Sequence, residues 1–133
     1  MGLPERRALK KFEDEIYPKL QTRINEAAGF DVPMTVKWDS LAEEGYGDLY
    51  EEAFHKVFFK PLLNAIKGVC IDDIGREALR DGLKSVKIQG EGSSDVSFAK
   101  GVLSLTFNPV ANLDEGSITE RAKAIQAALE KGL

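Results

Sequence analysis

The longest run of helical periodicity in the chain begins at Leu49 and continues to Val69. Its apolar side chains recur every three or four residues, the spacing that places them on one face of an α-helix. These residues are Leu49, Ala53, Phe54, Val57, Phe58, Leu62, Ala65, Ile66 and Val69. So wide a stripe is typical of a helix at the centre of a core. Pro61 interrupts the helix but does not change the phase of the stripe, so we expect one kinked helix there.

The N-terminal part of the chain repeats this pattern on a smaller scale. Leu9, Phe12, Ile16, Leu20 and Ile24 predict a long helix that ends at Gly29. Pro18 lies inside it and predicts a kink near Tyr17. Between residues 33 and 39 the period changes to two, which predicts a half-buried strand.

The C-terminal half contains a hairpin that can be checked against its own sequence. A two-residue turn at Lys100 and Gly101 would set residue 99 opposite 102, 98 opposite 103, 97 opposite 104 and 96 opposite 105. In this register apolar residues face apolar ones and serine faces serine. Val86 and Ile88 alternate in a further strand. Helices are expected after a cap at Asp72 or Asp73 and after Ser117, where Glu120 completes a capping box.

The resulting order of elements is α-β-α-α-β-β-β-α. It predicts a single α+β domain over residues 1–133, with about four helices packed on one face of a mostly antiparallel sheet of about four strands. No apolar run approaches the length that crosses a bilayer, so we expect no membrane contact and a cytoplasmic chain. Its one cysteine, Cys70, reads as a small core residue, and no cofactor is expected.

The most unusual composition lies between Asp39 and Glu52, where fourteen residues contain six acids and no base. Asp48 precedes Glu51 by three residues, a spacing that predicts a cap at the start of the central helix. The other acids have no such role and stand beside tyrosines, which are enriched at protein interfaces. The segment therefore predicts a surface for a protein partner, formed by Glu43, Glu44, Tyr46, Asp48 and Tyr50, and its acids would suit a basic one.

A second interpretation places a ligand pocket between the sheet and the helices. Helical spacing brings Glu51, Glu52 and the only histidine, His55, to one side of the central helix, and Trp38 and Asp39 end the strand before it. A metal centre is not expected, because a carboxylate-bridged site needs a second Glu-x-x-His unit. No residue stands out as catalytic.

Basic residues gather on the first helix, at Arg6, Arg7, Lys10, Lys11, Lys19 and Arg23. Acids are interspersed among them and the chain carries a net charge of −4, so nucleic-acid binding is not expected. The expected function is that of a noncatalytic small protein-binding module, of which an acidic inhibitor or immunity-type protein is one subclass. The alternative is a small enzyme or ligand binder, and the oligomeric state stays open.

Overall fold

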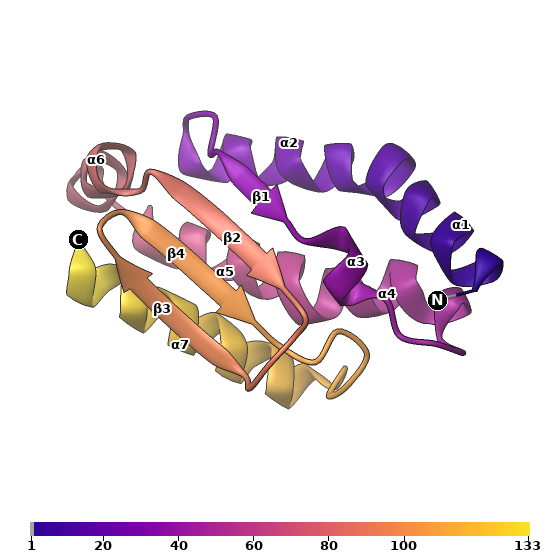
Figure 1. Ribbon diagram of the computed structural model, residues 1–133. Coiled ribbons are helices and arrows are strands. Elements are labelled where there is room, and N and C mark those ends of the chain that lie inside the picture. Colours follow the sequence, from indigo (N-terminus) through magenta and orange to yellow (C-terminus); the bar gives the residue numbers. More distant parts are fainter. Residues whose placement is uncertain (1) are drawn as a thin grey trace.

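The computed structural model describes residues 2–133, which form two layers (Figure 1). A four-stranded sheet makes one layer, and helices lie against one of its faces while the other face is left open. This arrangement confirms the broad α+β prediction. None of the helices between residues 2 and 133 combines the length and apolarity needed to cross a bilayer.

The sheet is mixed, so the prediction of a mostly antiparallel sheet is wrong. Its strands lie in the order β1 (Met34–Val36), β2 (Ser85–Gln89), β4 (Val102–Thr106) and β3 (Asp95–Ala99). The β1–β2 and β2–β4 pairs are parallel, and only β3 and β4 are antiparallel. The difference arises because the hairpin inserts β4 next to β2 and leaves β3 at the edge.

The register predicted for the hairpin is confirmed. Val96 pairs with Leu105, Ser97 with Ser104, Phe98 with Leu103 and Ala99 with Val102. Lys100 and Gly101, with φ of 53° and 80°, form the two-residue turn. Both residues thus occupy the left-handed region that a type I′ turn requires.

The first strand is shorter than predicted. The backbone N–H of Lys37 still donates to the Ile88 carbonyl at 2.9 Å, but Trp38 already begins the short helix α3 (Trp38–Leu41). Ser40 fixes this turn, because its hydroxyl donates to the Lys37 carbonyl and accepts from the Gly90 N–H. Trp38 therefore leaves the strand and packs against aromatic side chains of the first helices.

Both helices with internal prolines remain continuous through a π-helical turn. The first consists of α1 (Leu3–Lys11), the π turn η1 (Phe12–Ile16) and α2 (Tyr17–Ala28). The second consists of α4 (Tyr50–Phe54), the π turn η3 (His55–Phe59) and α5 (Lys60–Val69). A proline cannot donate to the carbonyl four residues earlier and would clash with it, so each π turn accommodates the carbonyl that the ring displaces.

The predicted helix at the core centre is confirmed, since Phe54, Val57, Phe58 and Leu62 are fully buried. Helix α5 packs against α2 and α7 (Glu115–Gly132), behind the sheet in Figure 1. Asp72, one of the two caps expected, caps α6 (Asp73–Gly82) by accepting from the Gly75 N–H. The cap of α7 is Asp114, so the capping box predicted at Ser117 is wrong.

Candidate functional site

Tyr50 is buried, so its predicted role as a partner contact is wrong. The side chain is 1% exposed and stacks on Phe54 with ring centroids 4.7 Å apart. Its hydroxyl accepts from the backbone N–H of Glu43 at 2.8 Å and donates to the carbonyl of the same residue at 2.9 Å. Tyr50 therefore anchors the acidic segment to the core and offers no surface itself.

The residues before Tyr50 form an exposed loop, residues 43–49, which we call the acidic loop. Glu43, Glu44 and Asp48 are exposed, and two larger apolar groups accompany them: Tyr46 is 43% exposed and Leu49 is 40% exposed. Leu49 was predicted to lie in the core stripe. It lies instead at the end of the 3₁₀ turn η2 (Gly47–Leu49), before the helical face begins.

The acidic loop rests against the first helix. A Cβ built on Gly47 would lie 3.5 Å from the Ala8 side chain, and Asp48 borders a small hollow together with Lys11. Asp48 makes no capping hydrogen bond to α4, whose N-cap is Leu49, so the predicted cap is wrong. Its carboxylate is left free for other contacts.

The five residues predicted to share a pocket lie in two places. Trp38 is half-buried, with its ring centroid 5.8 Å from that of Phe12 and 5.0 Å from that of Tyr17, and Asp39 is exposed on α3. Neither residue lines the cavity that contains the other three. The predicted location between sheet and helices is therefore wrong.

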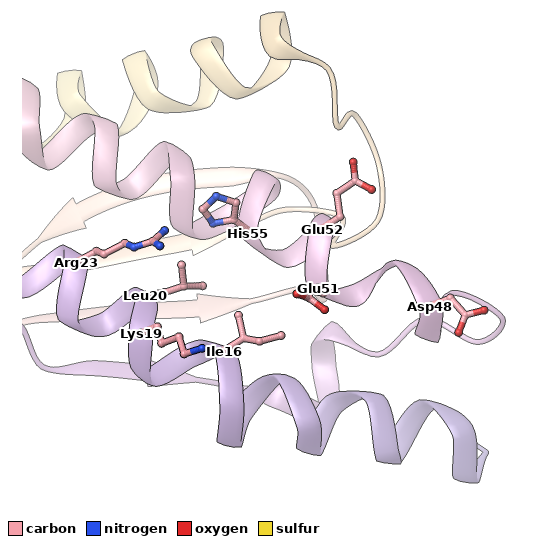
Figure 2. Close-up of a pocket in the computed structure, with 8 residues that line it drawn as sticks. All are labelled: Ile16, Lys19, Leu20, Arg23, Asp48, Glu51, Glu52 and His55. Carbon is pink, nitrogen blue, oxygen red and sulfur yellow. The ribbon is translucent and has the colours of Figure 1, made fainter.

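Glu51, Glu52 and His55 line a groove between two helices, with a volume of about 520 Å³ (Figure 2). The opposite wall comes from the end of η1 and from α2. The complete lining is Ile16, Lys19, Leu20, Arg23, Asp48, Glu51, Glu52 and His55. Lys19 and Arg23 were not predicted to lie in this groove, because the sequence grouped them only with the other basic residues of the first helix, which are exposed.

The environment of His55 favours a neutral imidazole. Burial lowers its pKa from the usual 6.5, and the positive charges of Lys60, Arg23 and Lys56 lower the pKa further. Nδ1 is buried and has no hydrogen-bond partner among the described residues. The imidazole therefore keeps hydrogen-bonding capacity that the fold does not use.

The nearby carboxylates do not form a catalytic pair with His55. Glu52 accepts from the Lys56 ammonium at 2.6 Å, and Figure 2 shows its side chain directed away from α2. A general base usually has a third group that orients its imidazole, and neither Glu51 nor Glu52 accepts a hydrogen bond from Nδ1 of His55. Within residues 2–133 no three His, Cys, Asp or Glu side chains are placed to share a metal ion.

Comparisons of the chain with protein-family models, with curated proteins and with solved structures find no match.

Proposed function

We propose that this chain is a noncatalytic binding module whose acidic loop contacts a basic protein partner. The observation that carries the proposal is the exposure of Tyr46 and Leu49 among Glu43, Glu44 and Asp48. Aromatic side chains act as anchors at interfaces, while surrounding charges steer the partner and fix its orientation. The acidic loop combines both kinds of group within seven residues.

The anchoring of the loop supports this proposal. The two hydrogen bonds of Tyr50 to Glu43 hold the start of the loop, and the Leu49 N–H donates to the Tyr46 carbonyl at 2.9 Å near its end. A surface that is ordered before binding loses less conformational entropy when a partner docks. The loop is thus suited to recognition of a folded or extended basic segment.

A reducing compartment such as the cytoplasm suits this module. Cys70 is the only cysteine and is half-buried, and burial raises the pKa of its thiol, which disfavours the reactive thiolate. An acidic inhibitor or immunity-type protein is a subclass compatible with the same surface.

The test begins with capture of binding proteins from a lysate of the source organism and purification of a basic one. Its association and dissociation rates are then measured at two salt concentrations. The variant Glu43→Gln with Glu44→Gln should associate more slowly and with a weaker salt dependence, because exposed charges act chiefly on the association rate. The variant Tyr46→Ala with Leu49→Ala should dissociate faster.

The matched control replaces two exposed helical acids elsewhere, Glu77→Gln with Glu120→Gln. It removes the same charge and should leave both rates as in the unmodified protein apart from a small general electrostatic effect. Capture of no basic protein, or equal rates for the control and the acidic-loop variants, would contradict the proposal.

A further inference from the structure

The two walls of the groove are built to the same pattern and carry opposite charges. Residues 16, 19, 20 and 23 on one helix and residues 48, 51, 52 and 55 on the other follow the same spacing, which places each set on one helical face. One wall presents the cations Lys19 and Arg23. The other carries the acids Asp48, Glu51 and Glu52, although the Glu52 side chain is directed away from α2.

These opposite charges do not neutralise each other across the groove. In the part of the chain that the structure describes, no ion pair involves Lys19, Arg23, Asp48 or Glu51. Of the groove's charged residues only Glu52 is paired, with Lys56 on its own helix. Four charges of both signs therefore remain free to meet a ligand.

Packing beneath the groove keeps the walls apart. Phe12 lies between the two helices, with ring centroids 5.2 Å from Phe54 and 5.9 Å from Phe59, and Tyr17 lies 5.6 Å from Phe59. Leu20 is buried and, with Ile16, forms the apolar part of the lining. The groove is thus preformed, because its width is set by a close-packed aromatic cluster.

The ends of the groove differ in charge. Figure 2 shows the Arg23 guanidinium directed toward His55 at one end, while Glu51 and Asp48 lie toward the other. After burial, the positive charges of Lys60, Arg23 and Lys56 lower the pKa of His55. An anionic group would therefore be favoured beside Arg23 and His55, and a cationic group beside Glu51 and Asp48.

We propose that the groove binds a small zwitterion, with its carboxylate held by Arg23 and His55, its ammonium held by Glu51 and Asp48, and an aliphatic chain over Ile16 and Leu20. A carboxylate suits the planar guanidinium, which offers two parallel donors. The apolar lining suits methylene groups between the charges. ω-Amino acids, in which methylene groups separate the ammonium from the carboxylate, have this chemistry.

Isotope-edited NMR titration can test the site with two zwitterions of different length, γ-aminobutyrate and ε-aminocaproate. Caproate and hexylamine serve as analogues that each lack one charge. At least one zwitterion should bind about tenfold more tightly than both analogues, since loss of one charge-assisted hydrogen bond costs that much or more. The shifted amide signals should come from residues of the two walls.

Variants then assign the charges. Arg23→Gln and Glu51→Gln should each weaken zwitterion binding about tenfold. Both side chains are exposed, so the fold should persist, which circular dichroism would verify. Arg7→Gln and Glu120→Gln, which make the same charge changes on exposed positions outside the groove, should bind as the unmodified protein does.

The binding of either analogue as tightly as the zwitterions would overturn the proposal, as would the absence of wall-specific shifts. Equal binding by Arg23→Gln and its Arg7→Gln control would do the same. Because the variant Glu43→Gln with Glu44→Gln leaves the groove intact, it should bind the zwitterion normally. The groove and the acidic loop can thus be tested separately.

Discussion

Replacing Tyr50 with phenylalanine removes a single oxygen and, with it, both hydrogen bonds to the backbone of Glu43. The ring and its stacking on Phe54 remain, so the substitution leaves only a very small cavity. Each hydrogen bond contributes roughly 0.5–1.5 kcal/mol net, and water can reach the freed groups because Glu43 is exposed. We therefore expect Tyr50→Phe to lower the free energy of unfolding by about 1–2 kcal/mol.

Chemical denaturation would measure this loss, and hydrogen exchange at the Glu43 amide would show where it originates. That amide should exchange faster in the variant, because the phenol no longer accepts its hydrogen. Tyr46→Phe is the matched control, since the Tyr46 side chain is 43% exposed, and it should stay within about 0.5 kcal/mol of the unmodified protein. Unchanged stability together with unchanged exchange at Glu43 would refute the anchoring role of Tyr50.

Two further predictions concern the core and the histidine. Phe58→Ala should cost about 3–5 kcal/mol in a denaturation experiment, because the side chain is fully buried, and a midpoint that barely moves would contradict its central position. The NMR titration midpoint of His55 should lie below 6.5, owing to burial first and then to the charges of Lys60, Arg23 and Lys56. The free energy of unfolding should accordingly fall as the pH drops below 6.5, because His55 takes up a proton more readily in the unfolded chain. A His55 titration midpoint above 6.5 would contradict its burial among these cations.

The features predicted correctly are those encoded by neighbours in the sequence. The hairpin register followed from the match of Val96 with Leu105 and Phe98 with Leu103 around a two-residue turn. The burial of Phe58 followed from helical spacing. The positions of Pro18 and Pro61 also predicted where the two long helices would be irregular. A kink was expected at each, and the structure has a π-helical turn instead.

The features predicted wrongly depend on partners distant in the sequence. Val86 and Ile88 alternate in the same way whether their neighbours run parallel or antiparallel, so the strand direction could not be read from them. Tyr50 resembled a surface residue because its hydroxyl partner is the backbone of Glu43, which has no side-chain signature. Likewise, only tertiary packing places Arg23 in the same groove as His55.

The parallel pairing of β1 with β2 has a consequence for the order of folding. The hairpin closes through a two-residue turn, whereas Met34 must find Val86 roughly 50 residues further along the chain, and contacts between distant residues form slowly. We expect β3 and β4 to pair early and β1 to dock late. Until it docks, the outer edge of β2 has unpaired backbone groups. This interval is when the chain is most prone to pair with another copy of itself.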